Sequence, residues 1–230
     1  MLVVFDVDGT LTRTAGTGAD FVCYARALAE VWGIVTTREE CNEVRHVTDR
    51  GTAEELVARH VGRAIGPEDL VPLHARFMEL LADALPDDPV RLAVPGAAAM
   101  LGHLRAAGHE VAIATGAWEA SARLKLARAG IALDGIPLGA CDDHPAREAI
   151  MEQAIARAGG RERHARVVYV GDAPWDVRAT RRLGLPLVGI DYDRSGRLDA
   201  HGVSVVLRDY TDVDAVLDAL VRARPPGGGA

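Results

Sequence analysis

Lysine is nearly missing from this 230-residue chain, because Lys125 is the one lysine among 26 Lys and Arg residues. Cysteine is scarce too. Cys23, Cys41 and Cys141 are scattered and odd in number, which disfavours a disulfide framework and is typical of reduced thiols. No apolar run approaches the roughly 20 residues that a membrane-spanning helix needs. These absences are typical of a globular protein without disulfides or membrane spans. Its single lysine, Lys125, is a candidate for a specific role.

An excess of positive charge is also absent. The net charge is −7 and no basic tract occurs, so we expect neither a nucleic acid nor a membrane surface as a partner. The chain starts without a basic region and reaches Asp6 after five residues, so we expect no signal peptide and a cytoplasmic protein. An apolar fraction of 49% is ordinary for a soluble protein with a full core.

Short apolar runs that alternate with helical patterns predict an α/β fold. The runs expected as strands lie at 2–5, 110–115, 136–140, 166–170, 186–190 and 203–207. Helical patterns precede, separate or follow the later runs, at 96–107, 118–129, 146–158, 174–183 and 212–223. This alternation favours right-handed crossovers and a parallel sheet with helices on both faces.

The stretch between the first two expected strands holds no good strand candidate. Helical patterns occupy 19–32 and 52–62, and another begins near Pro67. We therefore expect a core of 1–14 and 91–224, a small all-helical cap of 15–90 inserted after the first strand, and a disordered tail of 225–230.

Polar side chains follow four of the expected strands. They are Asp6 and Asp8 after the first strand, Thr115 after the second, Arg147 beyond the third, and Asp172 and Asp176 after the fourth. Because ligands of open α/β sheets bind at the carboxyl ends of the strands, we expect these side chains to meet at one site.

Three motifs carry a resemblance to a known family. They are DVDGT at 6–10, Thr115 after a strand, and GDAPWD at 171–176. In this order the motifs resemble those of the haloacid dehalogenase (HAD) superfamily. The helical insertion looks like the C1 cap of its phosphoglycolate phosphatase-like and β-phosphoglucomutase-like branch. The resemblance covers nearly the whole chain and implies a Rossmann-like HAD core.

The resemblance implies a role for each aspartate. Asp6 would attack phosphorus and form an aspartyl-phosphate, and Asp8 would act as general acid and then general base. Mg²⁺ would be held by Asp6, the backbone carbonyl of Asp8 and Asp172, with Asp176 as a further ligand or support. A site of several carboxylates plus a substrate phosphate suits Mg²⁺ because this cation prefers oxygen ligands.

The cation that should neutralise the phosphate is the departure from the family pattern. The family usually supplies a lysine near the helix after the third strand, and none occurs there. Arg147 lies at nearly the right offset and is the favoured substitute. Lys125, two turns into the helix of 118–129, is the alternative, and His144 is a weaker third candidate.

Two further groups of residues are expected to bind the substrate. Thr115 and the backbone N–H groups of Gly116 and Ala117 precede a helix and form a natural phosphate cradle, completed by Arg147 or Lys125. In the cap, the turn at Thr48, Asp49 and Arg50 is expected to face the site and contact the leaving group. The simpler reading of that turn is a helix N-cap.

These observations predict a Mg²⁺-dependent phosphatase that acts on a small phosphorylated metabolite. Asp8 favours phosphate-ester chemistry, because dehalogenation has no alkoxide leaving group to protonate. A phosphosugar mutase of the same fold would use the same residues and stays open. The missing family lysine also leaves open a catalytically impaired protein that only binds phosphorylated ligands.

Overall fold

The computed structural model of the chain describes residues 1–14 and 18–227. Its sheet has six strands, all paired in parallel, in the order β3-β2-β1-β4-β5-β6. The strands are β1 (Leu2–Phe5), β2 (Glu110–Ala114), β3 (Leu138–Gly139), β4 (Val167–Gly171), β5 (Leu187–Ile190) and β6 (Val205–Leu207). Each overlaps one of the apolar runs predicted as a strand.

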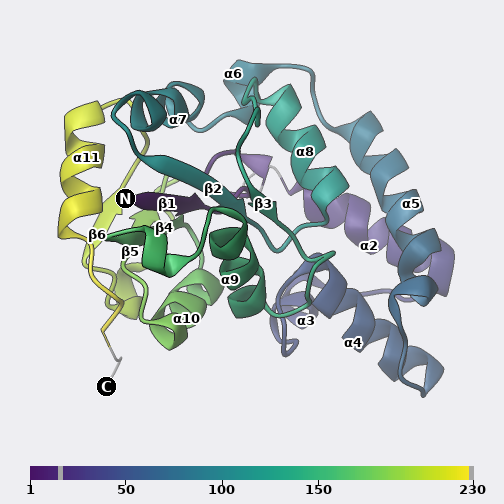
Figure 1. Ribbon diagram of the computed structural model, residues 1–230. Coiled ribbons are helices and arrows are strands. Elements are labelled where there is room, and N and C mark those ends of the chain that lie inside the picture. The colour runs from purple at the N-terminus through teal and green to yellow at the C-terminus, as the bar shows by residue number, and fades with distance from the viewer. Residues whose placement is uncertain (15–17, 228–230) are drawn as a thin grey trace.

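Helices cover both faces of the sheet. One side carries α7 (Ala97–Ala106), α8 (Glu119–Arg128) and α11 (Val213–Arg222), and the other carries α9 (Arg147–Arg157) and α10 (Pro174–Leu183) (Figure 1). The two covered faces explain why β1 is apolar throughout, with all four residues of LVVF buried. The predicted α/β core with a parallel sheet and flanking helices is confirmed.

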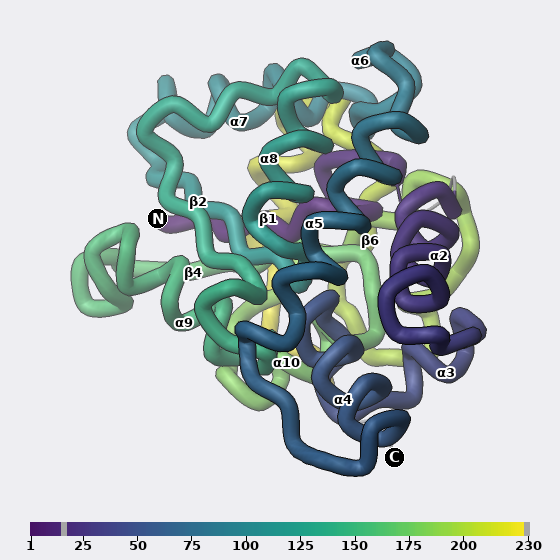
Figure 2. The backbone as a smooth tube through the Cα atoms, turned by 90° about the vertical axis from the view of Figure 1, so that its right-hand side faces the viewer, coloured from purple at the N-terminus to yellow at the C-terminus, as the bar shows by residue number. Residues whose placement is uncertain are grey.

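In the part of the chain that the structure describes, the insertion after β1 contains four helices. They are α2 (Ala19–Trp32), α3 (Arg38–Asn42), α4 (Asp49–Val61) and α5 (Pro67–Ala84). Figure 2 shows the molecule from the side on which the insertion lies, with α3 and α4 below α2 and α5. The described residues between 18 and 90 contain no strand. The predicted start of the cap at residue 15 lies outside the described residues, and α6 (Pro89–Leu92) spans its predicted end, so the boundaries remain a proposal.

An aromatic cluster docks the insertion on the core. Trp118 precedes α8, and its ring lies 5.9 Å from that of Tyr24 on α2 and 5.6 Å from that of Phe77 on α5. His74 stacks on the same ring at 4.9 Å. Trp118 is buried, so these contacts remove a large apolar surface from water. The cluster places the insertion over the carboxyl end of β2.

Some details differ from the predicted elements. Helix α4 begins three residues before the predicted 52, because Thr48 caps it by accepting a hydrogen bond from the Gly51 N–H at 3.0 Å. Of the predicted tail, residues 228–230 lie outside the described residues, whereas the carbonyls of Pro226 and Gly227 accept hydrogen bonds from Arg181. Within the described ranges, no helix is both long and apolar enough to cross a membrane.

Candidate active site

A cavity of about 310 Å³ lies where the insertion meets the carboxyl ends of the strands. Asp6 follows β1, Thr115 follows β2 and Asp172 follows β4, and all three line the cavity. Because β1 is paired with both β2 and β4, these three strand ends are adjacent. The sheet topology therefore brings together side chains that are more than 160 residues apart in the sequence.

Three carboxylates of the site are buried and lie close together. Asp6, Asp172 and Asp176 each offer an oxygen within 4.8 Å of the other two. Burial and the Asp176 charge raise the pKa of Asp6 to about 8, and burial with the same neighbour raises the pKa of Asp172 well above its usual range. Mutual repulsion of this kind is relieved by a cation. Oδ1 of Asp172 is buried without a hydrogen-bond partner among the described residues.

The donor set fits a divalent metal. All the ligand atoms on offer are carboxylate oxygens, which suit a hard cation such as Mg²⁺, Ca²⁺ or Mn²⁺. Asp176 is fixed in place, because its Oδ2 accepts hydrogen bonds from the N–H groups of Asp172 at 3.2 Å and Ala173 at 3.1 Å. Tyr169 donates to its other oxygen at 3.3 Å. These bonds orient the carboxylate before any cation arrives.

Gly9 explains why the first two aspartates can be followed by a sharp turn. Its φ of +85° lies in the left-handed region that favours glycine. A Cβ at this position would collide with the carboxylate of Asp172. The glycine of the DVDGT motif therefore allows the β1 and β4 ends to approach.

Arg147 is the cation beside Asp6. It is the first residue of α9, and its Nη1 lies 3.3 Å from Asp6 Oδ1 and 3.1 Å from Asp176 Oδ1. Its side chain is 11% exposed, and the guanidinium carbon lies 6.0 Å from the centre of the Trp175 ring. A mostly buried arginine in contact with two carboxylates is held in one place, as a phosphate-binding group requires.

Lys125 contacts a different carboxylate. Its side chain is fully buried, and Nζ lies 2.9 Å from Asp8 Oδ2 and 2.6 Å from Asp20 Oδ1. The hydroxyl of Thr14 donates a further hydrogen bond to Asp8. The third candidate cation, His144, is exposed and accepts a hydrogen bond from the Ala146 N–H at 2.9 Å, in the turn before α9. Of the three candidates, Arg147 is the one that contacts Asp6.

The predicted phosphate cradle lines the cavity. Thr115, Gly116 and Ala117 all face it. The hydroxyl of Thr115 accepts a hydrogen bond from the Ala117 N–H at 3.1 Å, which leaves its own hydrogen available to a ligand. The carbonyl of Gly116 accepts from the Asp49 N–H at 2.8 Å, so the cradle is tied directly to the insertion.

The predicted cap residues divide into two groups. Thr48 and Asp49 line the cavity, and Thr48 also serves as the N-cap of α4. The placement of Arg50 corrects our expectation, because it does not line the cavity. Its guanidinium pairs with Glu54 at 2.7 Å, one turn along α4, and donates to the Asp142 carbonyl at 3.1 Å.

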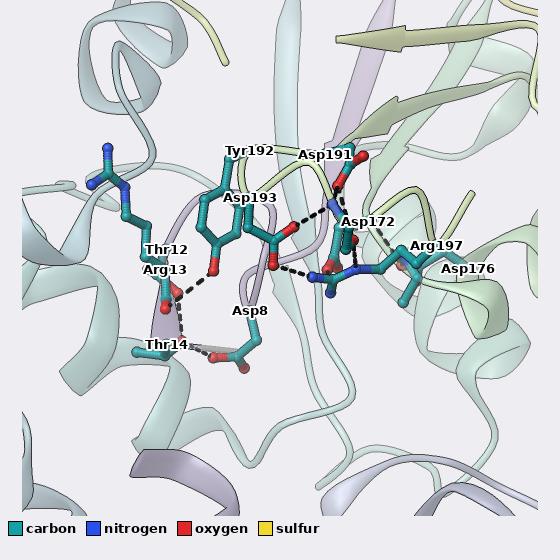
Figure 3. A network of polar contacts seen from close by, with 12 residues as sticks. Asp8, Thr12, Arg13, Thr14, Asp172, Asp176, Asp191, Tyr192, Asp193 and Arg197 are labelled. Carbon is teal, nitrogen blue, oxygen red and sulfur yellow. Dashed lines mark hydrogen bonds and ion pairs between the residues drawn. The ribbon is translucent and has the colours of Figure 1, made fainter. Parts of the chain in front are cut away.

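Three charged residues of the cavity wall were not predicted. They are Asp20 on α2, Arg38 on α3 and Arg197 in the loop after β5. The guanidinium of Arg38 lies 4.6 Å above the Phe21 ring, and Arg197 contacts Asp172 (Figure 3). None of the three belongs to a motif, and only the packing of distant segments brings them to the site.

Comparison with known proteins agrees with this arrangement. The sequence pattern of the haloacid dehalogenase-like hydrolases matches residues 1–184. The phosphoglycolate phosphatase of Rhodospirillum rubrum is 29% identical over 204 residues, which cover 84% of this chain and 80% of that protein. That of Mesorhizobium japonicum is 25% identical over 201 residues, which cover 85% of each. A solved β-phosphoglucomutase from Clostridium difficile shares the fold, with a TM-score of 0.68 at 14% identity over 96% of each chain.

The family match extends over most of the chain and includes both aspartate motifs, Asp6 to Thr10 and Gly171 to Asp176. The relatives cover both the core and the insertion. The predicted resemblance is thereby confirmed. The chain belongs to the haloacid dehalogenase-like hydrolases, and within them it is similar to phosphoglycolate phosphatases and shares its fold with a β-phosphoglucomutase.

Proposed function

We propose that the protein is a Mg²⁺-dependent phosphatase that hydrolyses a small phosphorylated metabolite through an aspartyl-phosphate on Asp6. The observation that carries this proposal is the position of Asp6, buried beside the Arg147 guanidinium and within 4.8 Å of two further carboxylates. The two phosphoglycolate phosphatases among the relatives support phosphate-ester chemistry.

The residues around Asp6 would bind and orient the phosphoryl group. Asp6, Asp172 and Asp176, with the Asp8 carbonyl, would hold Mg²⁺, which would offset the negative charge of the phosphoryl group and of Asp6. Thr115 and the N–H groups of the cradle would donate to the phosphoryl oxygens, and Arg147 would pair with them from the other side. In this arrangement the Asp6 oxygen attacks phosphorus while the leaving oxygen faces the insertion.

Asp8 would move the protons. Its carboxyl lines the cavity and is partly exposed, so it has access both to a leaving alkoxide and to water. The leaving group would lie against the wall formed by Phe21, Tyr24 and Arg38. A cavity of about 310 Å³ suits a small metabolite better than a protein or nucleic-acid substrate.

Turnover of p-nitrophenyl phosphate, with and without Mg²⁺, tests this function. We expect Mg²⁺-dependent release of p-nitrophenol by the unaltered chain and none above the uncatalysed rate by Asp6→Asn, which keeps the size of the side chain but removes the nucleophile. The thermal midpoint of Asp6→Asn serves as the folding control. The same comparison is made on a panel of phosphorylated metabolites.

The outcomes separate the alternatives. No Mg²⁺-dependent turnover on any phosphate ester, by a folded protein, would favour a protein that only binds phosphorylated ligands. Conversion of a sugar phosphate into its isomer without release of inorganic phosphate would favour the mutase.

A further inference from the structure

Arg197 reaches the acidic site from a loop that no motif marks. The loop follows β5, and Figure 3 shows the Arg197 guanidinium between Asp172 and Asp193. Its Nη1 donates to Asp172 Oδ2 at 2.8 Å and its Nη2 donates to Asp193 Oδ2 at 2.5 Å. The chain thus places a second arginine against its buried carboxylates, separate from Arg147.

The loop holds this arginine rigidly. Besides its two carboxylate contacts, Arg197 donates from Nε to the Ser195 hydroxyl at 2.7 Å. Asp191 fixes the turn by accepting hydrogen bonds from the Ser195 N–H at 2.9 Å and the Gly196 N–H at 3.0 Å. All three nitrogens of the guanidinium are therefore engaged, and its planar fork has one orientation.

The two oxygens of Asp172 have different surroundings as a result. Oδ2 accepts from Arg197, whereas Oδ1 is buried and has no hydrogen-bond partner among the described residues. A buried carboxylate oxygen left without a partner is costly unless a ligand completes it. The side chain of Asp172 is 4% exposed, so solvent offers little compensation.

We propose that Arg197 is a positioning residue of the metal site, which holds Oδ2 of Asp172 so that Oδ1 is presented to the divalent cation. This inference rests on the proposed function in one respect, since it requires the cation to bind at Asp6, Asp172 and Asp176. Arg197 contacts Asp172, a ligand of the cation, and not the cation itself. It acts by fixing the orientation of the Asp172 carboxylate.

The alternative is that Arg197 competes with the cation by adding positive charge. The contact with Asp193 argues against this, because the two side chains form a pair without net charge. Groups that hydrogen-bond a metal ligand usually favour binding, and their removal typically weakens metal affinity about 10- to 100-fold. The two roles predict opposite changes in affinity when Arg197 is removed.

Calorimetric titration of the purified, metal-free chain with Mg²⁺ tests the inference without any turnover. We expect Arg197→Gln to raise the Kd for Mg²⁺ about 10- to 100-fold. The double variant Arg197→Gln with Asp193→Asn removes one positive and one negative charge, so a loss of affinity there cannot come from net charge. Arg194→Gln, an exposed arginine of the same loop, is the matched control and should leave the Kd unchanged.

Each result has one meaning. Mg²⁺ binding by Arg197→Gln that is as tight as that of the unaltered chain, or tighter, overturns the positioning role. If the unaltered chain itself binds no Mg²⁺, the metal part of the proposed function fails instead. Should Arg197→Gln not fold, Arg197→Lys decides the matter, because a lysine keeps the charge but has one nitrogen in place of the planar fork that contacts Asp172, Asp193 and Ser195 together, so weakened binding is again expected.

Discussion

At the scale of single residues, the site depends on a missing side chain at Gly116. A Cβ there would collide with Nη2 of Arg147 and lie 3.2 Å from Cγ2 of Thr48. The guanidinium is the far end of a flexible side chain, so the fold can accommodate the new methyl group by moving it. Such a movement disturbs the 3.3 Å contact between Arg147 and Asp6.

We therefore expect Gly116→Ala to lower kcat/KM for a phosphate ester by roughly 100-fold, the typical cost of misplacing a catalytic group by about 1 Å. The thermal midpoint should change little. Gly102→Ala is the matched control, because a Cβ at this exposed position in α7 meets nothing within 4 Å and alanine favours the helix. Equal activities for the two variants would contradict a constraint on Arg147.

Some residues of the site were predictable from the sequence and others were not. Asp6 and Asp8 were predictable because their motif follows a buried strand whose carboxyl end has to face a ligand. The offset of Arg147 favoured it over Lys125 but left both open, because both lie on helices next to the site and only side-chain reach separates them. The contact between Arg197 and Asp172 was not predictable, because Arg197 lies in an irregular loop and belongs to no motif.

At the scale of elements, Lys125 joins a core helix to the insertion. It lies on α8, and its two ion pairs reach Asp8 after β1 and Asp20 in the first turn of α2. Burial lowers the pKa of this lysine, but the three nearby carboxylates of Asp20, Asp8 and Asp49 outweigh burial and raise it above its usual range. The ammonium is therefore charged and holds the two segments together.

We expect Lys125→Met to lower the free energy of unfolding, because two carboxylates lose their cation. Breaking a buried pair costs about 3–5 kcal/mol, and the loss here should be smaller since the Asp8 and Asp20 side chains are 23% and 24% exposed. Denaturant unfolding measures the change. The control on the same helix is Arg123→Met, whose exposed partner is Glu119, with an expected cost of at most about 0.5 kcal/mol.

A double-variant cycle identifies the cause of that loss. If the ion pair with Asp20 is responsible, Asp20→Asn should cost less in the Lys125→Met background than in the unaltered chain, because the unpaired charge is then gone. Strictly additive costs would show that the pair with Asp20 does not contribute, and would leave the pair with Asp8 and packing as the cause.

The helices and strands were largely predictable from the sequence. The physical reasons for this also explain which bounds were predicted wrongly. Strand and helix periodicities are local properties, so β1 at Leu2–Phe5 and α2 at Ala19–Trp32 match their predictions residue for residue. The two-residue β3 was predicted too long, because its length depends on pairing with β2 alone. The short helix α3 has no buried residues and hence no apolar period to recognise.

At the scale of the whole molecule, alternating strands and helices were enough to predict a parallel sheet, because crossover handedness leaves few topologies. How the insertion docks was not predictable. The cluster of Trp118 with Tyr24, Phe77 and His74 combines residues from three helical segments whose mutual approach no local pattern specifies. That docking also buries acidic side chains, and their burial gives the stability of the molecule a definite dependence on pH.

Burial raises the pKa of both Asp6 and Asp49 to about 8. Between roughly pH 4 and 8 these carboxyls keep their protons in the folded chain and lose them in the unfolded chain. The folded state then binds more protons, so the free energy of unfolding of the metal-free protein should fall as the pH rises through this window. Denaturant unfolding in EDTA between pH 6 and 9 measures the slope, and Asp49→Asn should make it shallower.

Mg²⁺ should reverse this trend. Its carboxylate ligands have to be ionised, so Mg²⁺ affinity rises as the pH approaches and passes the pKa of Asp6. A cation that binds only the folded state stabilises it by about 2.7 kcal/mol at 100 times its Kd, and this gain should grow with pH while the metal-free stability declines. Asp172→Asn should lose the response to Mg²⁺ yet retain the metal-free slope that Asp49 produces. Parallel slopes with and without Mg²⁺ would place the ion away from the buried carboxylates.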